Sequence, residues 1–201
     1  MLEFLASAFS GLKQLLDFCP QPPAITNLGG GFGIPYFSAD TELDIEAVGR
    51  GLGELLAKYR TFFPETSFMV ESGRYLIGES GLYVTRIRYR KVSRGETFLV
   101  MDGGLHHHLA ATGNFGQVVM RNYPIAALCK VGNPAAETFN IVGPLCTPLD
   151  LLGSKVELPA IEEGDLIGIF VSGAYGFSAS PRGFLSHPEP EEIVLGCGEV
   201  T

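Results

Sequence analysis

Residues 24–33 read AITNLGGGFG, a short apolar run followed directly by a glycine-rich loop. The apolar run at residues 24–28 has the pattern of a buried strand. Bare glycines let backbone N–H groups approach a phosphate closely, so the loop offers a candidate phosphate-binding site at Gly29, Gly30, Gly31 and Gly33. A tight turn without a ligand fits the same residues equally well, and the loop by itself does not separate the two interpretations.

The residues on either side of this loop follow the rhythm of an α/β architecture. Residues 2–18 and 44–59 carry apolar side chains at helical spacing, and prolines after residue 19 end the first helix. A second strand is predicted at residues 67–70. It ends at Glu71, Gly73 and Arg74, where parallel strands gather ligand-binding groups. A surface ion pair would explain Glu71 and Arg74 as well.

Beyond about residue 80 the pattern changes to short alternating strands. Residues 82–92 read LYVTRIRYRKV, with arginines on one face and mostly apolar or aromatic side chains on the other. Further strands are predicted between Gly and Pro turns, at residues 97–101, 117–120, 125–128, 138–142, 166–171 and 193–195. The sequence therefore predicts two domains, an α/β part at residues 1–80 and an all-β sandwich or barrel at residues 81–201.

Composition narrows the class of protein. Charged residues make up 18% of the 201 residues, below the roughly 25% that is usual, which indicates apolar surface covered by a partner. The net charge of -8 disfavours nucleic-acid or anionic-membrane binding, and no run of residues is long enough to span a bilayer. The cysteines show no CxxC or metal-ligand spacing, so we expect a reducing, cytoplasmic compartment without structural disulfides; they are Cys19, Cys129, Cys146 and Cys197.

Three further features of the β part could carry chemistry. Cys146 lies in the turn-rich sequence GPLCTPLD at residues 143–150, although a lone cysteine is most often a small core residue. Tyr175 follows a predicted strand, and a core tyrosine is its alternative. The histidines at residues 106–108 would point to opposite faces of an extended segment, so no metal site is expected there.

In their order and spacing, six motifs resemble those of group IV pyridoxal-phosphate-dependent decarboxylases, the ornithine/diaminopimelate/arginine family. They are the glycine loop, ESGR at residues 71–74, DGG at 102–104, GPLCTPLD at 143–150, GD at 164–165 and GAY at 173–175. The resemblance implies the last β/α units of an alanine-racemase-like TIM barrel, followed by a C-terminal β-sandwich or barrel domain. It also implies pyridoxal 5'-phosphate as cofactor, an amino acid as substrate, and a homodimer with shared active sites.

The same resemblance assigns roles to individual residues. Glu71 would face the pyridine nitrogen, and Cys146 of the second subunit would return a proton to the substrate's α-carbon. Thr147 and Asp150 would contact the substrate. The glycine loop would hold the cofactor phosphate, helped by Arg74 and by the hydroxyl of Tyr175, and Gly73 would also contact the cofactor.

The sequence departs from the family pattern at the substrate side. Thr147 stands where diaminopimelate and ornithine enzymes carry Glu or Asp, and Ala110 and Asn114 stand where the diaminopimelate pattern has Arg and Tyr. The carboxylate that would grip a distal ammonium is therefore missing. Residues 105–116 look more like the decarboxylases found with exosortase and exopolysaccharide systems, whose substrate does not follow from the motifs.

Family enzymes are roughly twice as long as this chain, and the early barrel strands with the Schiff-base lysine have no counterpart here. None of the five lysines lies in that context; they are Lys13, Lys58, Lys91, Lys130 and Lys155. Two hypotheses follow. The chain is a decarboxylase fragment that is inactive alone, or it is a non-catalytic homologue that binds or regulates a decarboxylase through its dimer face.

Overall fold

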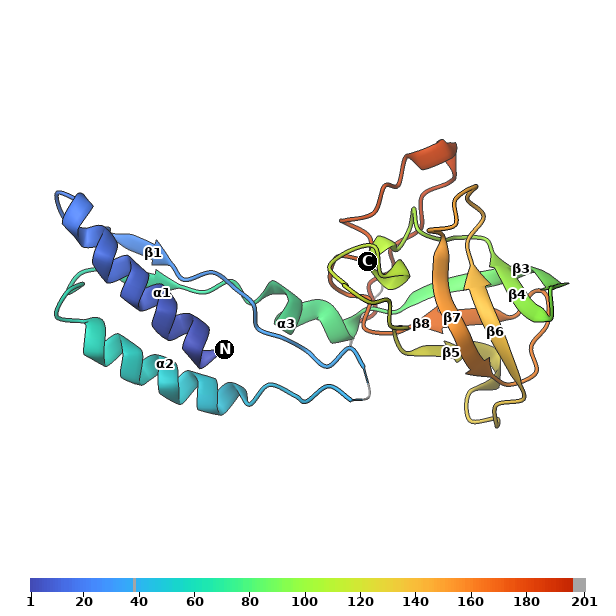
Figure 1. Ribbon diagram of the computed structural model, residues 1–201, viewed down its shortest axis with the longest axis horizontal. Coiled ribbons are helices and arrows are strands. Elements are labelled where there is room, and N and C mark those ends of the chain that lie inside the picture. The colour runs from blue at the N-terminus through green and yellow to red at the C-terminus, as the bar shows by residue number, and fades with distance from the viewer. Residues whose placement is uncertain (38, 197–201) are drawn as a thin grey trace. The chain divides into compact units, whose positions relative to one another are not determined.

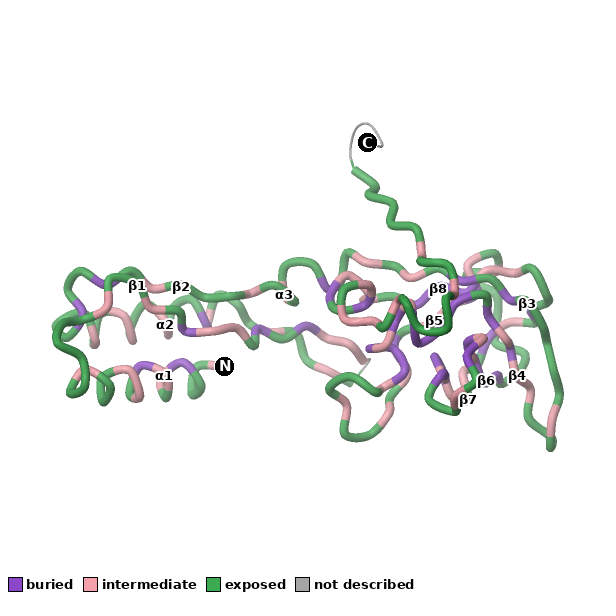
Figure 2. Tube along the Cα trace, turned by 90° about the horizontal axis from the view of Figure 1, so that it is seen from above, coloured by how far each residue is buried: buried purple, intermediate pink, exposed green. Residues whose placement is uncertain are grey.

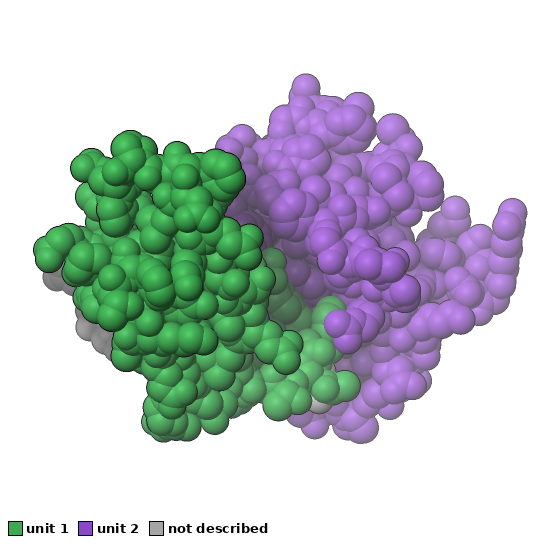
Figure 3. Space-filling view, turned by 60° about the vertical axis from the view of Figure 1, so that its left-hand side comes forward, with its two compact units in different colours: residues 1–78 green, residues 79–201 purple. Residues whose placement is uncertain are grey.

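The computed structural model describes residues 1–37 and 39–196. The chain divides into two compact units, Met1–Gly78 (unit 1) and Glu79–Thr201 (unit 2), which are coloured separately in Figure 3. The division falls two residues before the boundary at residue 80 that the sequence predicts. Cys197 lies outside the described residues. Within the described part of the chain, no helix is both long and apolar enough to cross a membrane.

Unit 1 contains both helices that the periodicity predicts (Figure 1). Helix α1, Leu2–Leu15, turns Leu5 and Phe9 into the core and continues as the 3-10 helix η1, Leu16–Phe18. Helix α2, Ile45–Tyr59, begins where the Asp44 side chain accepts a hydrogen bond of 2.8 Å from the amide of Ala47. This cap satisfies an amide that has no partner within the helix, which is why the helix starts there.

Two short parallel strands complete the first part of unit 1. Strand β1, Ile25–Asn27, pairs with β2, Ser67–Met69. The helices close one core around Phe9, whose ring centroid lies 5.2 Å from that of Tyr59 and 5.2 Å from that of Phe68. After β2 the chain forms helix α3, Gly73–Ile77, and the 3-10 helix η2, Gly78–Ser80, neither of which the sequence predicted.

Unit 2 is built on a six-stranded mixed sheet in the order β5-β8-β3-β4-β6-β7. All neighbouring strands are antiparallel except β4 and β6, which are parallel. The strands are β3 (Tyr83–Ser93), β4 (Glu96–Met101), β5 (Ile125–Ala127), β6 (Glu137–Val142), β7 (Leu151–Leu158) and β8 (Leu166–Ile169). The short 3-10 helices η3 (Leu109–Thr112) and η4 (Leu128–Lys130) lie between strands, and η5 (Phe184–Ser186) follows β8.

The two outer strands of this sheet meet, so the sheet closes almost into a barrel. Strands β5 and β7 are in contact. Just before β5, the Asn122 amide oxygen accepts 2.8 Å from the Ser154 N–H, and the Asn122 amide nitrogen donates 2.7 Å to the Ser154 carbonyl. The barrel interior is fully buried at Leu99, Phe139 and Ile167, and Figure 2 shows buried positions running along these strands. The chain thus contains a β domain, as predicted.

The structure of unit 2 differs from the local predictions at four places. Residues 117–120 and 193–195 form no strand, and the side chains of Val118, Val119 and Leu195 are exposed. Strand β7 was not predicted, because Gly153 and the positive φ of 51° at Lys155 break the alternation of its side chains. The three histidines lie in a turn, not in an extended segment, because the amides of His107 and His108 both donate to the Gly104 carbonyl.

Candidate functional site

The glycine loop of unit 1 follows β1 and is shaped by its backbone. Gly29 and Gly31 have φ of 81° and 88°, a region that side chains rarely adopt. A Cβ atom on Gly30 would lie 2.3 Å from the Glu71 carbonyl oxygen, whereas one on Gly33 would meet nothing within 4 Å. The loop can take this course only with glycines at residues 29–31.

This loop presents donors suited to an anion. The Gly29 amide donates 2.8 Å to the side-chain oxygen of Asn27, and its carbonyl accepts from the Glu71 amide at 2.8 Å. Within residues 1–37 and 39–196, the amides of Gly30, Gly31 and Gly33 have no hydrogen-bond acceptor. Backbone amides without a protein partner are available to donate to an oxyanion such as a phosphate.

Glu71 lies beside the loop at the carboxyl end of β2. Because β1 and β2 are parallel, their ends coincide, and the Asn27 side-chain amide donates a hydrogen bond to the Glu71 carboxylate. Gly73 opens α3, and the guanidinium of Arg74 lies 5.7 Å from the Tyr36 ring. Unit 1 therefore brings together the predicted loop glycines and Glu71, with Gly73 and Arg74 on the helix that follows.

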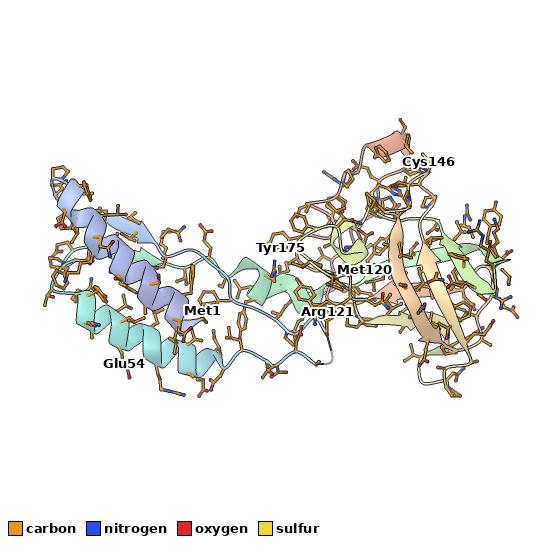
Figure 4. The ribbon with its side chains drawn as sticks, viewed as in Figure 1. Met1, Glu54, Met120, Arg121, Cys146 and Tyr175 are labelled. Carbon is orange, nitrogen blue, oxygen red and sulfur yellow. The ribbon has the colours of Figure 1, made fainter. Side chains whose placement is uncertain are left out.

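In unit 2, Cys146 is exposed on the loop between β6 and β7 (Figure 4). Asp150 anchors this loop. The buried carboxylate of Asp150 accepts 2.8 Å from the Leu145 amide and 2.6 Å from the Leu105 amide. A Cβ atom on Gly143 or Gly104 would lie within 2.3 Å of this carboxylate, so both glycines make room for it. Exposure of the Cys146 thiol argues against the core interpretation of this cysteine.

Asp150 has a structural task that the sequence did not reveal. Burial raises the pKa of its carboxyl group, and the two amide donors, which favour the ionised form, oppose that shift. Both oxygens are engaged with backbone, so the carboxylate positions the Cys146 loop; direct contact between Asp150 and substrate stays a prediction. The Thr147 hydroxyl accepts 3.3 Å from the Leu149 amide in the same loop.

The histidine turn, residues 105–109, connects this loop to two other segments. Because a carbonyl only accepts, His107 donates from Nε2 to the Pro188 carbonyl at 2.7 Å, and its Nδ1 accepts from the Tyr83 hydroxyl at 3.2 Å. His108 contacts the Ser172 hydroxyl at 2.8 Å. His106 is fully buried, and its two ring nitrogens have no partner among the described residues.

Burial dominates the electrostatics of this turn. It lowers the pKa of both His106 and His108 to about 4, so both imidazoles are neutral at physiological pH, and in His106 the neighbouring His107 and His187 add to the shift. Burial also raises the pKa of the Tyr83 hydroxyl. Among the described residues, no group of three His, Cys, Asp or Glu side chains could hold a metal ion.

Tyr175 lies on the loop that follows β8. Its backbone has a φ of 62°, and its ring centroid is 5.8 Å from that of Phe115 (Figure 4 labels Tyr175). The side chain is 42% exposed, which argues against the core interpretation of this tyrosine. Unit 2 therefore carries Cys146, Thr147, Asp150 and Tyr175 on loops that the histidine turn connects. Sequence reasoning missed Ser172 and the role of the turn, because their partners lie 64 or more residues apart in the chain.

A comparison with protein families matches residues 17–173 to a model described as "Pyridoxal-dependent decarboxylase, C-terminal sheet domain". The L-glutamyl-[BtrI acyl-carrier protein] decarboxylase of Niallia circulans is 48% identical over 176 residues, which cover 86% of this chain and 41% of that protein. Diaminopimelate decarboxylase of Bacillus subtilis is 29% identical, covering 95% of this chain and 43% of that protein. The chain thus spans less than half the length of these relatives.

Solved structures agree on the fold. A crystal structure of diaminopimelate decarboxylase from M. jannaschii superposes with a TM-score of 0.79 at 24% identity, covering 96% of this chain and 42% of that one. The Helicobacter pylori diaminopimelate decarboxylase complexed with L-lysine gives a TM-score of 0.77 at 23% identity, covering 98% of this chain and 46% of that one. At these identities, the likeness concerns the fold alone.

Proposed function

This chain belongs to the pyridoxal-dependent decarboxylase family, and from that membership we propose that the complete protein removes the α-carboxylate of an amino-acid substrate with pyridoxal 5'-phosphate as cofactor. The match over residues 17–173 is the observation that carries the proposal. In this proposal, unit 1 corresponds to the last β/α units of an alanine-racemase-like barrel, and unit 2 is the C-terminal β domain. The chain contributes part of an active site that the rest of the protein completes.

The glycine loop fits the phosphate of this cofactor. Gly29 and Gly31 turn the backbone through positive φ, and the unpartnered amides of the loop would donate to phosphate oxygens. Arg74 would add a positive charge, Gly73 would let the backbone at the start of α3 come close, and the resemblance adds the Tyr175 hydroxyl. When bound, the cofactor supplies an electron sink for the carbanion left by departing CO₂.

Glu71 would keep the pyridine nitrogen protonated. The hydrogen bond from Asn27 orients its carboxylate, and its place at the end of β2 supports this role. In the complete protein, Glu71→Gln keeps the shape of the side chain but removes the charge. We expect decarboxylation to fall by about a hundredfold or more, while the cofactor still binds. Unchanged turnover in this variant would remove Glu71 from the mechanism.

Cys146 would return a proton to the α-carbon of a substrate bound to the partner subunit of a homodimer. Its exposed thiol on a loop fixed by Asp150 supports this role. A thiol positioned beside the α-carbon can act as a general acid, because its sulfur releases the proton and carries the remaining charge as a thiolate. Each active site would then require two subunits.

Mixed dimers test the sharing of the site. Cys146→Ala subunits and subunits lacking the cofactor-linking lysine are each expected to be impaired, and their mixture should regain part of the activity because one site per heterodimer is whole. Both variants should still dimerise, which sedimentation can verify. A mixture that stays inactive while heterodimers form would show that Cys146 does not act across the interface.

The substrate proposed here has no free distal ammonium. Thr147, Ala110 and Asn114 offer no charge that could pair with one. By its name, the Niallia circulans relative decarboxylates an L-glutamyl group attached to an acyl-carrier protein. In this proposal, a carrier-linked acyl group takes the place of the distal ammonium. We therefore favour a carrier-linked amino-acyl group for this protein as well. The link to exosortase and exopolysaccharide systems stays a prediction.

A competition assay tests the substrate class. The complete protein is offered diaminopimelate, ornithine, free L-glutamate and L-glutamyl-carrier protein at equal concentrations, and CO₂ release is assigned by isotope label. Preference for the carrier-linked group by about tenfold or more is expected, since a missing charge-assisted hydrogen bond costs roughly 1.5–3 kcal/mol. Preference for either diamino acid would refute the proposal.

We also propose a cytoplasmic location. The described cysteines are unpaired, which is compatible with a reducing compartment.

A further inference from the structure

The loop that follows β8 is held in an unfavourable backbone conformation. Val171 and Tyr175 have φ of 58° and 62°, in the left-handed region. A β-branched or aromatic residue rarely adopts this region and persists there only when its surroundings impose it. Tyr175 is the residue whose hydroxyl the proposed function assigns to the cofactor phosphate. The contacts that impose the conformation of this loop therefore also determine where Tyr175 lies.

The imidazole of His108 packs against the loop that follows β8. Its ring is almost fully buried, with Tyr83 and Tyr123 packed edge-on at centroid distances of 5.6 Å each. A Cβ atom on Gly176 would lie 3.4 Å from His108 Nε2, so the imidazole lies directly against the residue that follows Tyr175. His108 and the loop thus form one packed unit although they are far apart in the chain.

Hydrogen bonds fix the tautomer of this imidazole. The Ala111 amide donates 3.2 Å to His108 Nδ1, so Nδ1 is the acceptor. The neutral ring then carries its proton on Nε2 and donates 2.8 Å to the Ser172 hydroxyl, which in turn donates 2.7 Å to the Ile169 carbonyl at the end of β8. The result is a directed chain of hydrogen bonds from η3 through the ring into the strained loop.

A second connection runs parallel to the first. The Leu109 amide donates 2.8 Å to the Ser180 hydroxyl, which donates to the Gly176 carbonyl. The Ser172 amide also donates a hydrogen bond of 2.9 Å to the Gly81 carbonyl. A Cβ atom on Gly81 would lie 2.1 Å from the backbone nitrogen of Gly173, so the two glycines are in close contact. The loop is thereby fastened on both sides of Tyr175.

We propose that His108 is a positioning residue for Tyr175, which it holds through Ser172 in the conformation that presents the tyrosine hydroxyl to the cofactor. This inference rests on the proposed function for the role of Tyr175, whereas the fastening of the loop by His108 stands on the contacts alone. His108 also caps η3 through Ala111, so a purely structural role in that helix is the alternative that an experiment must separate.

Two substitutions of His108 separate these roles in the complete apoprotein. The side-chain oxygen of Asn overlies the Nδ1 position, so His108→Asn retains the cap on Ala111 but cannot reach Ser172. The amide nitrogen of Gln overlies Nε2, so His108→Gln retains the donor to Ser172 and loses the cap. Ser172→Ala removes the same contact from the other side.

Titration with pyridoxal 5'-phosphate gives the first readout. We expect His108→Asn and Ser172→Ala each to raise the dissociation constant about tenfold, the size of one lost hydrogen bond, and His108→Gln to leave it within about threefold. The double variant His108→Asn/Ser172→Ala should be no weaker than either single variant, because both remove one contact. If Gln weakens binding as much as Asn does, or if Asn binds like the wild type, the proposal is wrong.

Hydrogen exchange in residues 171–180 gives the second readout and does not depend on the cofactor. His108→Asn and Ser172→Ala should accelerate exchange there about tenfold, whereas His108→Gln should not. Tyr175→Phe tests the assignment of the hydroxyl separately. If Tyr175→Phe leaves cofactor affinity unchanged, the proposed role of Tyr175 fails, while exchange still decides whether His108 fastens the loop. Unchanged exchange in His108→Asn would overturn the fastening itself.

Discussion

The two units shape their functional loops by different means. Unit 1 uses the backbone, since positive φ at Gly29 and Gly31 and the close approach of Gly30 to Glu71 give the loop its course. Unit 2 uses buried polar side chains, with Asp150 and His108 each joining segments that are distant in the chain. Backbone shape is independent of pH and intolerant of added atoms. Side-chain hydrogen bonds depend on protonation and tolerate isosteric replacement.

Acidification should produce the largest difference between the units, because all four histidines lie in unit 2. His106 and His108 have a pKa of about 4 in the folded state, below the unfolded value of about 6.5. The unfolded chain therefore binds more protons between these values, and stability is lost as pH falls through this window. At pH 5 we expect unit 2 to lose about 2 kcal/mol for each histidine.

Urea unfolding at pH 7 and pH 5, read separately for each unit by pulsed hydrogen exchange, measures this loss. His108→Gln removes one titrating group, so it should roughly halve the dependence of unit 2 on pH. Equal acid destabilisation of both units would contradict the assignment of the effect to the buried histidines.

Removing the Asp150 carboxylate should have the next largest effect. Asp150→Ala leaves the buried amides of Leu105 and Leu145 without acceptors, which we expect to lower the free energy of unfolding by about 3 kcal/mol. Asp17→Ala, at an exposed position of unit 1, is the matched control and should change stability by less than about 0.5 kcal/mol. Urea denaturation measures both. Similar losses in the two variants would refute the anchoring role of Asp150.

A methyl group on the glycine loop should disturb unit 1 by a smaller amount. Gly30→Ala places a Cβ atom 2.3 Å from the Glu71 carbonyl oxygen, which forces the ends of β1 and β2 apart and should cost about 1–3 kcal/mol. At Gly33 there is open space and no positive φ, so Gly33→Ala should be nearly neutral. Thermal unfolding followed by circular dichroism compares the pair, and a neutral Gly30→Ala would show that the loop is not constrained by contact.

Gly49 of unit 1 does not shape the backbone, and its substitution should have the smallest effect on stability, with the opposite sign. It lies inside α2 with nothing within 4 Å of its Cβ position. Gly49→Ala should therefore stabilise the chain by about 0.5–1 kcal/mol through the higher helix propensity of alanine. A small rise in the urea midpoint with an unchanged slope is the expected result; destabilisation would indicate a contact that the structure does not contain.

Prediction from sequence succeeded where local rules act. The helical periodicity of α1 and α2 and the alternation of β3 are local, and each gave an element close to its observed bounds. Strand β7 was missed because its alternation is broken at Lys155. Residues 193–195 were wrongly predicted to form a strand, because an apolar run has the same local pattern whether or not it has a pairing partner.

The candidate site divides in the same way. Gly29, Gly31 and Glu71 could be found because motif and conformation coincide in a short segment. The partners of His107 and His108 could not, because Pro188 and Ser172 lie 81 and 64 residues away from them in the chain. A run of three histidines invites a metal interpretation from sequence, and only the folded chain reveals its hydrogen-bonding role.

The pairing of Asn122 with Ser154 has a consequence for how the protein behaves in a crowded solution. An uncovered edge of a sheet is a template onto which another chain can add a strand, and this is a common start of aggregation. Asn122 binds the N–H and the carbonyl of Ser154 as a neighbouring strand would, and so occupies that part of β7. One amide side chain thereby protects the seam of the barrel from recruiting a second molecule.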